Sequence, residues 1–311
     1  MVSVSELQKR FDVLFQEMGK VVVGQQEVLK EIVIALMCDS HALLEGYPGL
    51  AKTLAIKTLS QTMDLGFSRI QSTPDLLPAD IIGTYIIDES KGKKQFAFQQ
   101  GPVFANMVLV DEINRSTPKT QSALLEAMQE RQVTVGNSTF KLDDPFFVLA
   151  TQNPIEQLGT FKLPEAQSDR FLLKIKLDYP SFEDEFEIIE RYATGRKLVA
   201  PKKVFTKESL KYVQEITKQV PMSIDLKKYA VSVVTATRKR KDMIEYGASP
   251  RASIGLILAA KAKALIEGHK CVMKEDVISM AYPILRHRII LTFEAERNHL
   301  NEDDIIKELI K

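Results

Sequence analysis

The chain has 311 residues, of which 45% are hydrophobic and 27% charged, and its formal net charge at pH 7 is +1. This length predicts two domains with an ample core, and the charge balance gives no global reason to expect nucleic-acid binding. The sequence has two cysteines far apart, which predicts that both are small buried side chains in a reducing environment. It shows neither a basic start followed by an apolar leader nor an apolar run of about 20 residues, so we expect a soluble cytoplasmic protein.

The first half of the chain alternates short apolar runs with helix-length segments. Such runs, apolar on both faces, predict a parallel five-stranded sheet flanked by helices, an α/β fold. The predicted strands are HALLEG (41–46), FSRIQST (67–73), NMVLVDE (106–112), PFFVLATQN (145–153) and RFLLKIKLD (170–178). Helical periodicity follows the first strand over 52–64 and the third over 117–131, where Thr117 is the expected N-cap and Pro118 the first helical residue.

Two segments alternate around turn residues and predict hairpins that project from the sheet edges. They are 83–101, with its turn at Lys91-Gly92, and 131–144, with its turn at Gly136-Asn137. Loops of no special function are the alternative for both.

After Asp178 the pattern changes to one of continuous helices. YPSFEDE (179–185) is typical of a linker that leads into a helix, so we expect a domain boundary near residue 182, with an α/β domain over 1–182 and a smaller all-helical domain over 183–311. The predicted helices are 184–194, 207–217, 225–247, 251–268 and 274–289, with an amphipathic end helix over 301–311.

The segment GYPGLAKT (46–53) lies between the first strand and the following helix, where backbone N–H groups face an anion. Lys52 is expected to reach the outer phosphates of a nucleotide, and the Thr53 hydroxyl to hold Mg²⁺. Ala51 stands where the usual pattern has a second glycine, which is acceptable if this residue has a negative φ. A chance strand–turn–helix is the alternative.

Two carboxylates end the third predicted strand (106–112), and an amide ends the fourth (145–153). Asp111 could bind Mg²⁺ through water and Glu112 could activate the attacking water, unless both are solvated loop residues. Asn153 could contact the γ-phosphate or the water, or simply form an Asn-Pro turn.

Two arginines could stabilise phosphoryl charge. Arg170 precedes the fifth strand and could serve a neighbouring subunit, or form an ion pair with Glu165 or Asp169. Arg251 stands in the first turn of a helix, where a cation is unfavourable unless a polyphosphate compensates it, although an exposed arginine would cost little.

Taken together, these motifs resemble those of the AAA+ ATPases and, within them, the MoxR family, from about Val21 to Arg288. The residues that carry the resemblance are GYPGLAKT, LVDEINRSTPKTQSALLEAMQE, ATQNP, LPEAQSDRF and GASPRA followed by LRHR. The family commonly has alanine at the position of Ala51.

The resemblance implies roles for these positions. ATP and Mg²⁺ are the implied ligands, with Lys52 and Thr53 as Walker A, Asp111 and Glu112 as Walker B, and Arg170 or Arg115 as the arginine finger. Asn153 and Arg251 resemble the first and second sensors, and VVVGQ (21–25) the segment that lines the adenine pocket. The implied nucleotide-binding residues are therefore Val23, Gly24, Gln25, Gly46, Tyr47, Pro48, Gly49, Leu50, Ala51, Lys52, Thr53, Leu54, Asp111, Asn153 and Arg251.

The resemblance further implies a homo-oligomeric ring, a hexamer, with ATP between the α/β domain and a helical lid and with both hairpins facing the pore. Its implied task is chaperone-like, on protein clients that include von Willebrand A-type proteins. A nucleic-acid motor of the same fold and a nucleotide-gated scaffold without hydrolysis are the alternatives, disfavoured by the charge balance and by the Asp111-Glu112 pair respectively.

Overall fold

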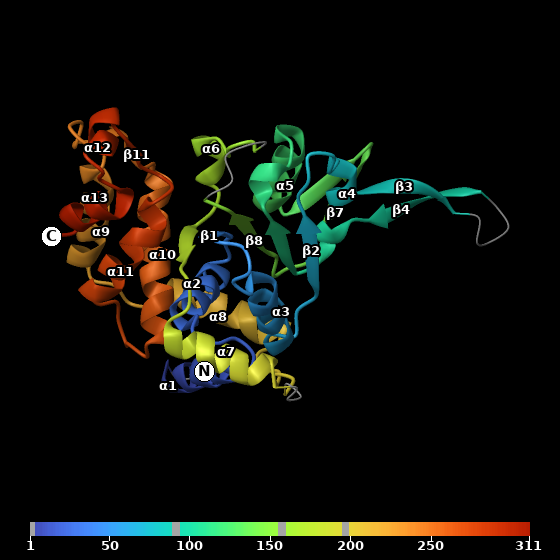
Figure 1. Cartoon of the computed structure of the whole chain (residues 1–311), viewed down its shortest axis with the longest axis horizontal. Coiled ribbons are helices and arrows are strands. Elements are labelled where there is room, and N and C mark those ends of the chain that lie inside the picture. The colour runs from blue at the N-terminus through green and yellow to red at the C-terminus, as the bar shows by residue number, and fades with distance from the viewer. Residues whose placement is uncertain (1–3, 89–93, 155–159, 195–198) are drawn as a thin grey trace.

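The structure is a computed structural model and describes residues 4–88, 94–154, 160–194 and 199–311. Figure 1 shows these elements. In chain order they are α1 (Val4–Gly19), α2 (Gln26–Met37), β1 (Ala42–Gly46), α3 (Lys52–Thr62), β2 (Phe67–Gln71), α4 (Pro78–Ile82), β3 (Gly83–Asp88), β4 (Gln95–Gln100), η1 (Pro102–Phe104), β5 (Met107–Asp111), η2 (Ile113–Arg115), α5 (Pro118–Glu130), β6 (Gln132–Val135), β7 (Ser138–Lys141), β8 (Phe147–Gln152), α6 (Glu165–Ser168), β9 (Leu173–Leu177), α7 (Phe182–Tyr192), α8 (Lys207–Gln219), α9 (Ile224–Ala236), β10 (Ile244–Tyr246), α10 (Pro250–Ile266), α11 (Lys274–Leu285), β11 (Ile290–Leu291), α12 (Phe293–Arg297) and α13 (Glu302–Leu309).

The predicted parallel sheet is confirmed. Its five strands follow the order β2-β5-β8-β1-β9, and every neighbouring pair is parallel. Successive side chains of a strand point to opposite faces, so Leu43 and Leu44 of β1 belong to different hydrophobic clusters. The carboxyl ends of all five strands therefore share one edge of the sheet, and their amino ends share the opposite edge.

Helices cover both faces of this sheet. On one face α5, whose predicted Thr117 cap and Pro118 start are confirmed, contributes Leu124 and Leu125. On the other face α1, α2 and α3 contribute Phe11, Ile32 and Ile56 to a cluster that also includes residues of α10 and α11. Because this second cluster is continuous, the C-terminal helices pack firmly on the α/β part.

Both predicted hairpins are present and contact each other. The β3–β4 hairpin extends away from the sheet at the end of the molecule opposite α9 to α13, and its predicted turn at Lys91-Gly92 lies outside the described residues (Figure 1). The β6–β7 hairpin turns at Gly136-Asn137 as predicted. The ring of Phe98 in β4 stacks on that of Phe140 in β7, with centroids 4.1 Å apart, so the two hairpins share an aromatic contact.

The C-terminal part is helical, with two departures from the prediction. The helix expected over 225–247 ends at Ala236, and β10 then pairs with β11 in a short antiparallel sheet. Gly247 explains part of this change, because a Cβ there would lie 2.8 Å from the Thr237 backbone and only glycine permits the close return of the chain.

Cys271 is exposed, so the expectation of burial is wrong for it, whereas Cys38 is buried.

The lid helices lie beside the sheet rather than above its carboxyl edge. Helix α11 packs along β9, the edge strand. Arg286 and Lys176 both contact Asp303, at 2.6 and 3.0 Å, which joins the lid to β9. Over the described ranges, no helix combines the length and the apolar character that a bilayer crossing requires.

Candidate active site

A cavity of about 520 Å³ opens at the carboxyl edge of the sheet, where β1 leads into α3. Residues 48–54 form one wall of the cavity, and the ends of β2, β5 and β8 form the other. Lys52 is the first residue of α3, so the loop delivers it at the N-terminus of the helix, where backbone N–H groups have no partner within the helix. The loop, Lys52 and Thr53 thus meet Asp111 and Glu112 in one cavity, as an anion site beside acidic residues.

The conformation of Ala51 is not the expected one. Its φ is 54° and its ψ 25°, in the left-handed region, whereas the sequence argument required a negative φ. An alanine in that region carries a strain of about 1–2 kcal/mol that a glycine would not. The loop therefore has, at this position, a backbone conformation that favours glycine, although the residue is alanine.

Lys52 spans the mouth of the loop. Its ammonium donates a hydrogen bond to the Gly46 carbonyl oxygen. Burial lowers the pKa of Lys52, while the nearby Asp111 and Glu112 carboxylates oppose that shift. A phosphate that displaces the carbonyl would meet a lysine that is preorganised inside the loop.

Asp111 and Glu112 end β5 and are fixed by Thr151 of β8. The Thr151 hydroxyl donates to Asp111 Oδ1 at 3.2 Å and accepts from the Glu112 backbone N–H at 2.9 Å. Glu112 has a φ of 55°, a strained conformation that sends its side chain away from the strand direction. Arg115 Nη1 donates to Glu112 Oε2 at 2.9 Å, so Arg115 contacts the carboxylate of its own chain.

Three polar residues that line the cavity were not predicted from the sequence: Arg69, Gln71 and Thr151. Arg69 is the most consequential, since its Nε donates to Asp111 Oδ2 at 2.8 Å. The signal in the sequence was weak: Arg69 and Gln71 are polar residues at alternate positions of a predicted strand, and Thr151 is a hydroxyl within an otherwise apolar strand.

Residues 23–25 lie against the phosphate loop, the segment 46–53 between β1 and α3. Gln25 Nε2 donates to the Leu50 carbonyl oxygen at 2.9 Å. Gly24 has a φ of 72°, and a Cβ there would come within 2.5 Å of Asp184 in α7. The ring of Tyr47 stacks on that of Tyr179, just before α7, with centroids 4.8 Å apart. These contacts place α7 and residues 23–25 together beside the loop, as a base-binding pocket would require.

The donor set of the cavity fits a magnesium nucleotide. Thr53 and Asp111 supply a hydroxyl and a carboxylate, and Mg²⁺ is usually held by one or two such groups together with waters and substrate phosphates. Among the described residues, no group of three or more His, Cys, Asp or Glu side chains could hold a metal ion without such help. Asn153 follows β8 at the same edge, two residues after Thr151.

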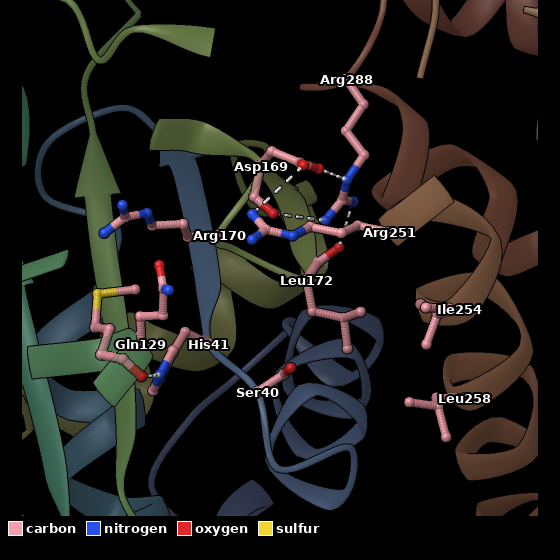
Figure 2. A pocket seen from close by; sticks show the side chains of 12 residues that line it. Ser40, His41, Gln129, Asp169, Arg170, Leu172, Arg251, Ile254, Leu258 and Arg288 are labelled. Atoms are coloured by element: carbon pink, nitrogen blue, oxygen red, sulfur yellow. Dashed lines mark hydrogen bonds and ion pairs between the residues drawn. The ribbon is translucent and has the colours of Figure 1, made fainter. Parts of the chain in front are cut away.

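Arg170 and Arg251 do not join this cavity and lie at the opposite edge of the sheet. The Leu172 N–H donates to the His41 carbonyl oxygen at 2.8 Å, which aligns the residues before β9 with the residue before β1. Arg170 and Arg251 line a separate cavity of about 230 Å³ there, together with His41 (Figure 2). The predicted position of ATP between the α/β part and the lid, with Arg251 of the same chain on it, therefore differs from the arrangement observed.

Asp169 organises this second cavity. Its carboxylate accepts from Arg288 Nε at 2.6 Å and from the Ser249 hydroxyl at 3.0 Å, and Arg251 lies 3.8 Å away. Figure 2 shows the Arg170 side chain extending away from this group. Arg251 is 57% exposed, so its guanidinium remains accessible.

The fold and the first cavity define a P-loop nucleotide-binding protein with an appended helical lid. Comparison with known proteins is consistent with this class. The family described as "ATPase family associated with various cellular activities (AAA)" matches residues 41–173, and the AAA lid domain matches residues 236–309.

Similarity to individual proteins extends over nearly the whole chain. Chaperone MoxR1 of Mycobacterium tuberculosis is 45% identical over 95% of this chain and 79% of its own length. Protein YeaC of Bacillus subtilis, which is uncharacterised, is 40% identical over 95% of this chain and 91% of its own length. A crystal structure from Cytophaga hutchinsonii, of a protein assigned provisionally to the ATPases, superposes with a TM-score of 0.92 at 45% identity, covering 99% of this chain and 95% of the other. The chain belongs to the MoxR family of AAA+ ATPases.

Proposed function

We propose that the protein hydrolyses ATP with Mg²⁺ as a ring-forming chaperone of the cytoplasm, built from units 1–182 and 183–311. The observation that carries the proposal is the cavity that joins Lys52 and Thr53 of the loop to Asp111 and Glu112 of β5. Phosphate-binding and water-activating groups then lie on opposite walls of one space, as phosphoryl transfer to water requires.

Each residue of this cavity has a separate task in the proposed reaction. Lys52 and the N-terminus of α3 bind the outer phosphates, and Thr53 and Asp111 hold Mg²⁺, which supplies charge stabilisation at the phosphoryl oxygens. Glu112 accepts a proton from the attacking water, and Asn153 orients that water or the γ-phosphate. Thr151 keeps Asp111 and Glu112 in register through its two hydrogen bonds.

Arg170 and Arg251 act on the nucleotide of a neighbouring subunit in this proposal. The strand β1, from Ala42 to Gly46, separates them from their own phosphate loop by roughly 15 Å, at about 3.3 Å per residue. A head-to-tail contact between identical subunits would bring the amino edge of one sheet to the phosphate loop of the next, and such a contact forms a ring when the rotation between subunits closes. We propose a hexamer, with both arginines supplied in trans.

Protein clients are the proposed substrates, and von Willebrand A-type proteins are one class of them. The name of the relative Chaperone MoxR1 supports such a task. The β3–β4 hairpin supports it too, because Ile87 and Phe96 are 57% and 79% exposed and could contact an unfolded segment. A charge balance of +1 favours protein over nucleic acid as the partner.

Mixing of inactive subunits tests the proposal. Wild type should release phosphate from ATP, whereas Glu112→Gln and Arg170→Ala should each lose turnover but still bind ATP. Mixed one to one, the two variants should regain activity, since random assembly makes roughly a quarter of the interfaces complete. Arg251→Ala should behave as Arg170→Ala does.

Two results would contradict parts of this proposal. Equal phosphate release by wild type and Glu112→Gln would exclude the hydrolytic mechanism. Loss of turnover in Arg170→Ala without recovery on mixing would exclude action in trans.

A further inference from the structure

We propose that Arg69 is a charge gate on the magnesium site, which holds Asp111 through its guanidinium until a phosphate draws the guanidinium away. The inference rests on the proposed function, because it concerns how Mg²⁺ and nucleotide share the cavity. It assigns to Arg69 two alternative partners in this site, the Asp111 carboxylate and a phosphate of the nucleotide.

Arg69 is held against the carboxylate that would bind the metal ion. Its Nε and Nη2 lie 2.8 and 2.7 Å from Asp111 Oδ2, so a single carboxylate oxygen receives both contacts. The other oxygen, Oδ1, accepts from the Thr151 hydroxyl at 3.2 Å. Both oxygens of Asp111 are therefore engaged, and a positive charge occupies the space beside Oδ2.

Strand geometry keeps the guanidinium in this position. In β2, Arg69 and Gln71 are two residues apart and so point to the same face, while Ile70 between them is buried on the other face. Gln71 is paired with Asp111 in the register of β2 and β5. Gln71 Oε1 accepts from Arg69 Nη2 at 2.6 Å, so Gln71 orients the guanidinium towards the end of β5.

The same pairing recurs at the adjacent acid. Arg115 Nη1 donates to Glu112 Oε2 at 2.9 Å, so each carboxylate of the Asp111-Glu112 pair has its own arginine in the structure. A divalent cation that approached this neutralised pair would meet two guanidinium groups of like charge. These two ion pairs therefore oppose the entry of a divalent cation for as long as the arginines hold the carboxylates.

A polyphosphate would reverse this balance. Arg69 lines the same cavity as Lys52 and Thr53, and its side chain is 48% exposed, so it can turn without unpacking the core. The guanidinium fork matches phosphate oxygens as well as it matches a carboxylate. Transfer of Arg69 from Asp111 to phosphate would release Oδ2 for the metal at the moment when the phosphates bring further oxygen ligands.

Reciprocal coupling follows from this exchange. If nucleotide opens the metal site by drawing Arg69 away, the metal must raise nucleotide affinity by the same factor. Replacing Arg69 by Gln should abolish most of this coupling, because the metal site would then be open at all times.

Binding of Mn²⁺, followed by the EPR signal of the free ion, measures the gate without any turnover. The full-length protein is titrated with and without ADP, as wild type, Arg69→Gln and Arg10→Gln, the last a matched loss of charge on the exposed face of α1. Without ADP, Arg69→Gln should bind Mn²⁺ about tenfold more tightly than wild type, within the range of about 5–150-fold typical of coupled sites. Arg10→Gln should match wild type.

Two further measurements complete the test. In EDTA, ADP should bind Arg69→Gln several-fold more weakly than wild type, because a phosphate contact is lost. Asp111→Asn should abolish the Mn²⁺ signal change, which assigns the signal to this site, and should leave metal-free ADP affinity equal to or above that of wild type, because Arg69 is released. Arg69→Lys, which keeps the charge but not the fork, serves if Arg69→Gln does not fold, and should show partial coupling.

The outcomes separate this proposal from the proposed function. If wild type binds no ADP even with Mn²⁺, the nucleotide site itself is wrong. If wild type binds ADP with Mn²⁺ but Arg69→Gln retains the wild-type Mn²⁺ affinity and the wild-type effect of ADP, the gate is wrong and the nucleotide site stands.

Discussion

Replacement of Ala51 by glycine should stabilise the protein, which is unusual for an alanine at the start of a helix. The φ of Ala51 is 54°, where an L-residue with a side chain carries about 1–2 kcal/mol of strain. Glycine removes that strain but gives the unfolded chain more freedom, which costs about 0.4–1 kcal/mol. We therefore expect Ala51→Gly to raise the free energy of unfolding by about 0.5–1 kcal/mol, an increase in Tm of about 1–3 °C.

Thermal unfolding of the nucleotide-free protein, followed by circular dichroism, measures this change. Ala79→Gly is the matched control, because Ala79 is also exposed and lies near the start of a helix, the short α4, but does not have a positive φ. Glycine there should lower stability by about 0.5–1 kcal/mol. Opposite signs for the two substitutions would support the left-handed conformation at Ala51, and an equal loss of stability in both would refute the reasoning.

Three other predictions concern the second cavity and the hairpins. Asp169→Asn should lower the free energy of unfolding by about 3 kcal/mol, because the Arg288 side chain is only 4% exposed and would lose its charged partner. Lys207→Ala, at an exposed ion pair, should change the free energy of urea unfolding by at most ~0.5 kcal/mol, and an equally small change in Asp169→Asn would contradict the prediction. Burial lowers the pKa of His41 to about 3, so the unfolded state takes up the proton first as the pH falls below the unfolded pKa near 6.5. The free energy of unfolding should therefore fall by about 2 kcal/mol by pH 5, and urea unfolding of His41→Asn should depend correspondingly less on pH. Phe140→Ala should remove a stacking energy of about 1 kcal/mol and speed amide exchange in β3 and β4 about fivefold, while Phe140→Tyr should not.

The sequence alone predicted those site residues whose position depends only on the strand or helix next to them in the chain. Lys52 and Thr53 follow the strand β1 and open a helix, and Asp111 and Glu112 lie at the end of β5, another strand of the same parallel sheet. Their meeting at one edge therefore follows from parallel topology alone. The five strands and the Thr117 cap were predictable for the same reason, because periodicity and capping are properties of short segments.

The sequence did not predict contacts in which a side chain of one strand reaches a residue of another strand. Arg69 and Thr151 reach Asp111 from β2 and β8, and their own segments show only that they are polar residues in strands, not which residue they contact. The positive φ of Ala51 also follows from how the loop closes onto α3, which residue type alone could not indicate.

The placement of the lid is the largest feature that the sequence left undecided. The order of motifs predicted Arg170 and Arg251 as partners of a nucleotide, and Arg170 lies at the amino edge of the sheet because it precedes β9 in the chain. Arg251 joins it there only because α11 packs on β9 and Arg288 forms an ion pair with Asp169. A helix of given sequence can dock on either side of a sheet, because its own apolar face does not specify the partner face. The position of Arg251 relative to the first cavity is therefore decided by the tertiary structure.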